Sequence, residues 1–135
     1  MTTRARVILI EDNDDDRELT RRVIIRHGWH IDLEIAINGM EGISYLVDHP
    51  NTDMALIDVN LPLVNGFDVV ARVRQVLSVK APAMILMTTS TNPSYIQKAQ
   101  KAGATEFHVK PMALQDYATL LEGLFERHLI ASSWR

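Results

Sequence analysis

Short apolar runs alternate with amphipathic stretches along the chain. Residues 7–10 form an uninterrupted apolar run, which predicts a buried strand. The segment 14–27 places Leu19 and Val23 on one helical face and ends before a glycine, as helices commonly do. The segment 31–37 alternates apolar and polar residues, which is typical of an edge strand. The first part of the chain therefore predicts a strand, a helix and an edge strand in that order.

The same alternation continues towards the C-terminus. The further predicted elements are a helix over 39–49, a strand over 54–58, a helix over 67–77, a strand over 84–88, a helix over 93–103, a strand over 106–110 and a helix over 113–129. Five strands and five helices joined by short connections favour an α/β fold. Because each crossover between parallel strands carries a helix, the sheet is expected to be parallel with helices on both faces.

Composition and charge are those of a small globular protein. The 135 residues are 47% hydrophobic and carry 14 Lys and Arg against 17 Asp and Glu, a net charge of −3. These values exclude a disordered chain and a basic nucleic-acid coat, and the length predicts one domain over 1–135. The chain has no cysteine, which excludes disulfides, thiolate nucleophiles and cysteine-ligated metals. No apolar run approaches the ~18 residues that cross a bilayer, so we expect a cytoplasmic protein.

Acidic residues are concentrated directly after the first predicted strand. Six of the 17 fall within eight positions, namely Glu11, Asp12, Asp14, Asp15, Asp16 and Glu18. For 14–16 we favour a solvated helix start, since the helix macrodipole stabilises carboxylates there. That interpretation does not suit Glu11 and Asp12, which adjoin the buried strand. A cationic ligand is expected beside them.

Polar groups lie at the carboxyl ends of four of the five predicted strands. They are Glu11 and Asp12 after the first strand, Asp58 at the end of the third, Thr88 at the end of the fourth and Lys110 at the end of the fifth. In open α/β sheets, ligands bind beyond these ends. Three carboxylates in one crevice require a cation or a large rise in pKa, and oxygen ligands alone favour Mg²⁺ over zinc. The hydroxyl of Thr88 and the charge of Lys110 suit an oxyanion, most simply a phosphoryl group accepted by a carboxylate.

At these positions the sequence resembles the receiver domains of two-component response regulators, from about Arg6 to Arg127. The resemblance rests on Glu11-Asp12, on Asp58-Val59-Asn60-Leu61-Pro62 with Asn65-Gly66 following, on Thr88 and on Lys110-Pro111. It implies a doubly wound, flavodoxin-like sheet of five parallel strands in the order 2-1-3-4-5 with five helices. The expected core covers about 6–127, and 130–135 is expected to be a short tail.

The resemblance also implies a role for each residue of the acidic site. Asp58 is the expected phosphoacceptor. Asp12, Asp58 and the backbone carbonyl of Asn60 are expected to ligate Mg²⁺ directly, with Glu11 acting largely through water. Glu at the first acidic position, where the family commonly has Asp, is a mild departure.

Thr88 and Lys110 are expected, by the same resemblance, to hold the phosphoryl oxygens, and Phe107 occupies the family's switch-aromatic position. Phosphorylation is expected to draw the Thr88 hydroxyl towards the phosphoryl group and the Phe107 ring inward. Even before phosphorylation, the Phe107 ring is expected to be inward in a substantial fraction of molecules, because phenylalanine has no hydroxyl to hold the ring outside. The Lys110–Pro111 bond is expected to be cis, which costs only ~0.5–1 kcal/mol before proline.

The resemblance implies that a sensor histidine kinase or a phosphotransfer protein supplies the phosphoryl group. The segments 11–13 and 88–90 are similar to those of stand-alone receivers paired with bacterial phytochromes. The arginines of the first helix are interpreted equally as a salt-bridged surface or as a kinase-docking surface; they are Arg17, Arg21, Arg22 and Arg26. No nucleic-acid or membrane partner is expected, and output is expected to pass through protein contacts.

The last helix predicts a surface for self-association. Its apolar residues fill more than one stripe and include Tyr117, Ala118, Leu121, Leu124 and Phe125. Ile130 and Trp134 continue the apolar character beyond the helix. Because one stripe suffices for the core, the excess predicts a homodimer or partner surface at the fourth helix, fifth strand and last helix.

Other interpretations remain open at this point. A phosphohydrolase of the haloacid-dehalogenase-like type would need a second acid two residues after Asp58, where this chain has Asn60. A nucleotide-binding protein would need a glycine-rich phosphate loop, and neither of the usual motifs is present. A receiver used as an unphosphorylated interaction domain would not need the intact site. The five histidines show no metal-pair spacing and are interpreted as structural or surface residues.

Overall fold

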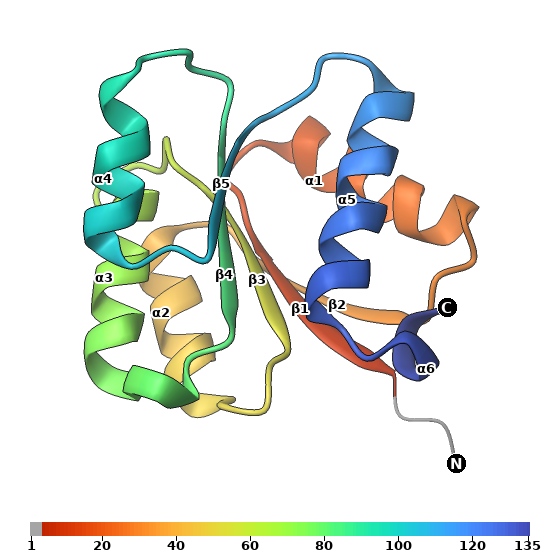
Figure 1. Cartoon of the computed structure of the whole chain (residues 1–135), viewed down its shortest axis with the longest axis horizontal. Helices are drawn as coiled ribbons and strands as arrows, with labels where there is room; N and C mark the ends of the chain where they lie inside the picture. The colour runs from red at the N-terminus through yellow and green to blue at the C-terminus, as the bar shows by residue number, and fades with distance from the viewer. Residues whose placement is uncertain (1–3) are drawn as a thin grey trace.

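The computed structural model describes residues 4–135 and contains a five-stranded parallel sheet (Figure 1). The strands are β1 (Ala5–Ile10), β2 (Ile31–Ala36), β3 (Met54–Asp58), β4 (Ala83–Thr88) and β5 (Glu106–Val109). Their order is β2-β1-β3-β4-β5, and each neighbouring pair is parallel. The predicted class and strand order are confirmed. All five carboxyl ends consequently lie at one edge of the sheet.

Helices cover both faces of this sheet. They are α1 (Asp14–Arg26), α2 (Gly39–Asp48), α3 (Gly66–Leu77), α4 (Ser94–Ala102), α5 (Leu114–His128) and α6 (Ala131–Trp134), with a 3₁₀ turn, η1 (Ser78–Lys80), after α3. Figure 1 shows α2, α3 and α4 on one side and α1, α5 and α6 on the other. The five long helices begin and end within one residue of the predicted positions, whereas α6 lies in the segment predicted to be a tail. Within residues 4–135, none of the helices has the length and apolar character needed to span a membrane.

The alternation of side chains along β1 divides the core in two. Val7 and Leu9 belong to the core beneath α1 and α5, whereas Ile8 and Ile10 belong to the core beneath α2, α3 and α4. Both faces of β1 are therefore buried, which explains its uninterrupted apolar run. The edge strand β2 instead alternates buried and exposed residues, as predicted.

Asparagine caps place three helix starts beside the carboxyl edge of the sheet. The side chains of Asn13, Asn38 and Asn65 accept hydrogen bonds from the third amide of α1, α2 and α3 at 2.9, 2.8 and 3.0 Å. Gly66 begins α3 so close to β3 that a Cβ there would lie 2.4 Å from the carbonyl oxygen of Asp58. A side chain at position 66 would therefore push α3 away from the strand that ends at Asp58.

The apolar residues of α5 from which an excess was expected belong to the core, so that expectation was wrong for these positions, whereas Leu114 at the start of α5 is 44% exposed. Its buried residues are Tyr117, Ala118, Leu121, Leu124 and Phe125. Trp134 of α6 is fully buried and meets Trp29 and Phe125 edge to face, with ring centroids 5.8 and 5.6 Å apart. The C-terminal segment thus covers the helix that precedes it. These side chains supply no argument for a dimer.

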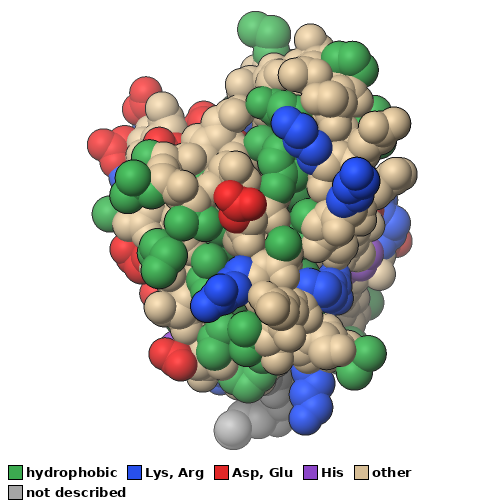
Figure 2. All heavy atoms as spheres, turned by 90° about the vertical axis from the view of Figure 1, so that its left-hand side faces the viewer, with side chains coloured by type: hydrophobic (Ala, Val, Ile, Leu, Met, Phe, Trp, Pro, Cys, Tyr) green, Lys and Arg blue, Asp and Glu red, His purple; other side chains and the backbone are tan. Residues whose placement is uncertain are grey.

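Other exposed apolar side chains lie on the surface to which the dimer was assigned. Ile96 of α4 and Val109 of β5 are 53% and 46% exposed. Figure 2 shows the face made by α2, α3 and α4, where hydrophobic side chains lie among those of Lys and Arg. Scattered apolar residues are usual on protein surfaces, so the homodimer stays a prediction.

Glu106 joins the start of β5 to the end of α5. Its carboxylate accepts hydrogen bonds from Arg127 at 2.8 and 3.0 Å, from His108 at 2.8 Å and from His128 at 2.5 Å. Arg127, assisted by the two histidines and opposed by burial, lowers the pKa of Glu106 to about 2. His108 and His128 are therefore structural residues, as predicted.

Replacing Trp134 with alanine tests whether α6 is part of the core. The change removes a fully buried indole, and we expect the free energy of unfolding to fall by about 3–5 kcal/mol in urea titrations. Ile130→Ala, at a residue that is 75% exposed, is the control and should cost within about 0.5 kcal/mol. Equal values for the two variants would show that α6 lies outside the cooperative fold.

Candidate functional site

The structure brings Glu11, Asp12 and Asp58 together at the carboxyl edge of β1 and β3. One carboxylate oxygen from each lies within 4.8 Å of the others. Glu11 is 2% exposed, the Asp58 side chain is 12% exposed, and Asp12 faces solvent. Exposure to solvent therefore increases from Glu11 through Asp58 to Asp12. All three groups offer hard oxygen ligands.

Lys110 brings positive charge to this cluster from the end of β5. Its ammonium lies 2.5 Å from the Glu11 carboxylate, 3.5 Å from Asp16 and 3.9 Å from Asp58. The expected cis bond to Pro111 was wrong, because residues 4–135 contain no cis peptide. The Lys110 amide hydrogen-bonds to the Thr88 carbonyl at 2.7 Å, and the ammonium reaches the cluster with the trans bond that X-Pro amides ordinarily prefer.

Burial and neighbouring charges raise the pKa values of both Glu11 and Lys110. Burial raises the pKa of Glu11 to about 7, although the Lys110 ammonium opposes this shift. Burial alone would lower the pKa of Lys110, but its hydrogen bond to Glu11 and the charges of Asp58 and Asp16 outweigh burial and raise it. Lys110 therefore keeps its proton, whereas the charge on Glu11 depends on a nearby cation.

Thr88 and Asn60 form a second polar pair on the other side of Asp58. The Thr88 hydroxyl is buried and accepts hydrogen bonds from the Asn60 side-chain amide at 3.1 Å and from the Ser90 backbone amide at 3.0 Å. The Asn60 backbone amide points to an Asp58 oxygen at 3.4 Å. Phe107 is half-buried and packs against the core beneath α2, α3 and α4.

Asp16 is a member of the site that sequence reasoning missed. The favoured interpretation placed residues 14–16 together in solvent, but only the structure shows that Asp16 turns to Lys110 while Asp14 pairs with Arg17. The cap from Asn13 to the Asp16 amide defines this turn of α1. Three consecutive aspartates carry no sequence signal that distinguishes one from the next.

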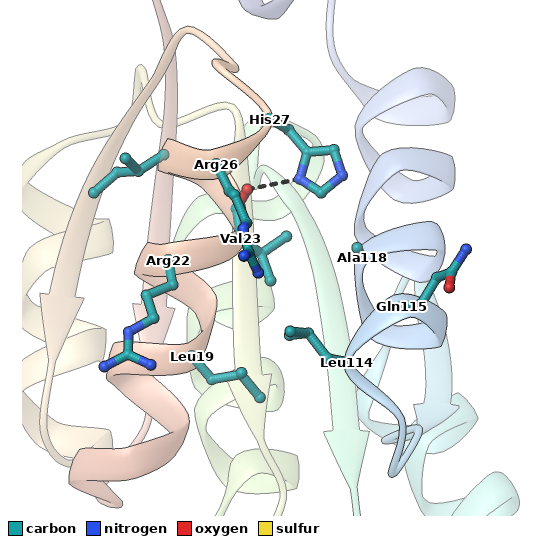
Figure 3. Close-up of a pocket in the computed structure, with 9 residues that line it drawn as sticks. Leu19, Arg22, Val23, Arg26, His27, Leu114, Gln115 and Ala118 are labelled. Carbon is teal, nitrogen blue, oxygen red and sulfur yellow. Dashed lines mark hydrogen bonds between the residues drawn. The ribbon is translucent and has the colours of Figure 1, made fainter.

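A groove runs between α1 and α5, the two long helices on one face of the sheet (Figure 3). We call it the α1–α5 groove; it encloses about 720 Å³ and is lined by Leu19, Arg22, Val23, Ile25, Arg26, His27, Leu114, Gln115 and Ala118. Leu19 and Leu114 point towards one another across it. Its lining is apolar apart from the two arginines, His27 and Gln115, so it suits an apolar surface with acidic groups at its margin.

Comparison with known proteins identifies one family. The sequence profile of the response regulator receiver domain matches residues 7–122. The chain is 29% identical over 117 residues to the chemotaxis protein CheY1 of Helicobacter pylori, which covers 87% of this chain and 94% of CheY1.

Two solved structures are similar along almost their whole length. The phosphorylated cyanobacterial phytochrome response regulator RcpA has a TM-score of 0.84 and 22% identity, covering 98% of this chain and 99% of RcpA. Response regulator RPA3017, in red light signalling of R. palustris, has a TM-score of 0.81 and 26% identity, covering 97% of this chain and 98% of RPA3017. At 22% identity, the similarity to RcpA shows a shared fold and nothing more.

The raised pKa of Glu11 predicts a pH dependence in metal-free protein. Because the folded value of about 7 exceeds the unfolded value of 4.5, the stability that Glu11 contributes at low pH is lost as the pH rises through this window. In EDTA we expect the Tm of the wild type to fall between pH 5 and pH 8 relative to that of Glu11→Gln, which cannot ionise. Parallel pH profiles for the two proteins, measured by calorimetry, would contradict this.

Proposed function

The chain belongs to the family of response regulator receiver domains, and on that premise we propose that it accepts a phosphoryl group on Asp58 and signals through changed protein contacts. Receiver domains are signalling phosphoacceptors and are generally not classed as enzymes. The observation that carries the proposal is the position of Asp58, whose carboxylate lies within 4.8 Å of those of Glu11 and Asp12 and 3.9 Å from the Lys110 ammonium. This arrangement combines a nucleophile with a group that neutralises phosphoryl charge.

The proposed reaction is a transfer from a phosphohistidine of the donor. A carboxylate oxygen of Asp58 attacks phosphorus, a P–O bond forms, and the P–N bond breaks as the imidazole leaves with its electron pair. Lys110, which keeps its proton because its pKa is raised, is proposed to hold one phosphoryl oxygen. The Thr88 hydroxyl is proposed to hold another. Catalysis then consists mainly of alignment and charge neutralisation.

The acidic cluster fits a hard divalent cation. Three carboxylate oxygens within 4.8 Å of one another repel strongly, and the raised pKa of Glu11 reflects a buried charge that Lys110 alone does not fully compensate. We propose that Asp12, Asp58 and the backbone carbonyl of Asn60 hold Mg²⁺, with Glu11 acting largely through water. When bound, Mg²⁺ supplies positive charge to the carboxylates and to the phosphoryl oxygens.

Thr88 and Phe107 are the proposed switch between chemistry and output. In the structure the Thr88 hydroxyl bonds to Asn60, so turning towards a phosphoryl oxygen requires it to leave that partner. The space it vacates is proposed to admit the Phe107 ring. Ala99 is the one fully buried residue of α4, and we propose that this helix is the element most easily displaced.

We further propose that the protein donor docks over the α1–α5 groove. Leu63 and Met112, on the loops after β3 and β5, are fully exposed large apolar residues and extend the contact surface around the site. The donor is proposed to be a sensor histidine kinase or a phosphotransfer protein. A kinase of the bacterial phytochrome type is supported by the likeness to RPA3017, which acts in red light signalling. The cytoplasmic location and the homodimer stay predictions.

Phosphorylation of Asp58 is tested with acetyl phosphate and Mg²⁺. Intact-mass measurement should show one labile phosphoryl adduct on the wild type and none on Asp58→Asn, which lacks the nucleophilic carboxylate. Asp32→Asn, at an exposed acid of β2, is the control and should be modified like the wild type. An adduct on Asp58→Asn would assign the phosphoryl group to another residue, and multiple-turnover loss of acetyl phosphate without any adduct would indicate a phosphohydrolase.

Charge reversal at the α1–α5 groove tests the docking surface. The donor for this test is a histidine kinase that phosphorylates the wild type. Arg26→Glu should slow the transfer from this kinase about tenfold, because like charges then meet across the interface. Uptake from acetyl phosphate should change by less than about twofold, since this small donor does not need the groove. Arg72→Glu, the same change on α3, is the matched control. Equal effects of the two substitutions on the kinase reaction would place the docking surface elsewhere.

A further inference from the structure

Three carboxylates share the Lys110 ammonium, but they are not equivalent. Glu11 accepts a short hydrogen bond from it at 2.5 Å and Asp16 a long one at 3.5 Å, whereas Asp58 forms only an ion pair at 3.9 Å. An ammonium has three N–H donors directed apart from one another. The two partners on the side of β1 and α1 therefore hold the charge away from Asp58.

Burial decides which partner is displaced when an anion arrives. Glu11 is 2% exposed, and removing its cation would leave a charge in a nearly dry environment. The Asp16 side chain is 43% exposed, so water replaces a lost ion pair at small cost. Asp16 is thus the exchangeable partner of Lys110, and Glu11 is the permanent one.

Local hydrogen bonds keep Asp16 in this position. Its amide donates to the Asn13 cap at 2.9 Å, and its carbonyl accepts from the Thr20 hydroxyl at 3.1 Å. The Thr20 oxygen lies 2.7 Å from the Tyr117 hydroxyl of α5, in a buried contact. The backbone of this turn is therefore held between α1 and α5, and the Asp16 carboxylate stays directed at the site.

We propose that Asp16 is a positioning residue for Lys110: in the resting site it draws the ammonium towards α1 and away from Asp58, where a phosphoryl oxygen must meet it. The inference rests on the proposed phosphorylation of Asp58. An interaction present in the ground state and lost in the transition state raises the barrier. Asp16 therefore slows phosphoryl acceptance and sets how readily the domain responds to small phosphodonors.

Asp16→Asn tests this by removing the charge while keeping the size of the side chain. With acetyl phosphate at saturating Mg²⁺, intact-mass time courses should show uptake at least about threefold faster than in the wild type. Asp15→Asn is the matched control, because it removes an exposed acid one residue away that, within residues 4–135, forms no ion pair with Lys110. It should leave the rate within about twofold. Asp16→Glu retains the carboxylate and should restore the slow rate.

A second measurement reports the contact without phosphorylation. The chain has four lysines, so labelling their ε-carbons with ¹³C yields four NMR signals, of which Lys110→Arg identifies one. In metal-free protein the Lys110 signal should shift in Asp16→Asn and stay in place in Asp15→Asn. The proposal is overturned if the Lys110 signal does not move in Asp16→Asn. It is also overturned if Asp16→Asn and Asp16→Glu take up phosphate from acetyl phosphate equally fast. A wild type that takes no phosphate overturns the proposed function instead, and the NMR comparison still decides whether Asp16 positions Lys110.

Discussion

The ion pair between Glu11 and Lys110 is the contact on which the carboxyl edge of the sheet depends. The residues are 99 positions apart in sequence, and their charged atoms lie 2.5 Å apart. They follow β1 and β5, which are separated in the sheet by β3 and β4. Because Glu11 is almost fully buried, its charge would be costly without this cation. The pair lets Asp12 and Asp58 approach it without placing three uncompensated charges in one crevice.

The fold supplies a rigid platform for this crowded edge. The central strands are buried on both faces by two separate apolar cores, and the helices that begin beside the site are capped by asparagine side chains. The groups that the proposed chemistry moves are side chains at strand ends, chiefly those of Lys110 and Thr88. Small side-chain displacements therefore suffice at the site, and the sheet does not need to deform.

The two sides of the molecule differ in how firmly their helices are held. Trp134 closes the core over α5, and Glu106 ties the end of α5 to β5 through Arg127 and His128. On the opposite face, Ala99 is the one fully buried residue of α4, and Tyr95 and Ala102 pack there only partly buried. A signal that leaves the site through Thr88 and Phe107 therefore meets less resistance at α4 than at α5, which favours α4 as the part of the output surface that rearranges.

The sequence by itself determined the α/β class, the bounds of the five long helices within a residue and the polar groups at the strand ends, because hydrophobic periodicity and caps are local properties. The resemblance to receiver domains supplied the strand order. Tertiary structure decided that the apolar residues of α5 pack into one core, with Trp134 against Phe125, since a sequence pattern marks which side chains need cover and not what covers them. It likewise decided that Asp16 and not its acidic neighbours turns to Lys110, 94 positions away. That choice depends on the direction of one turn of α1 relative to the end of β5, which only the packed sheet defines.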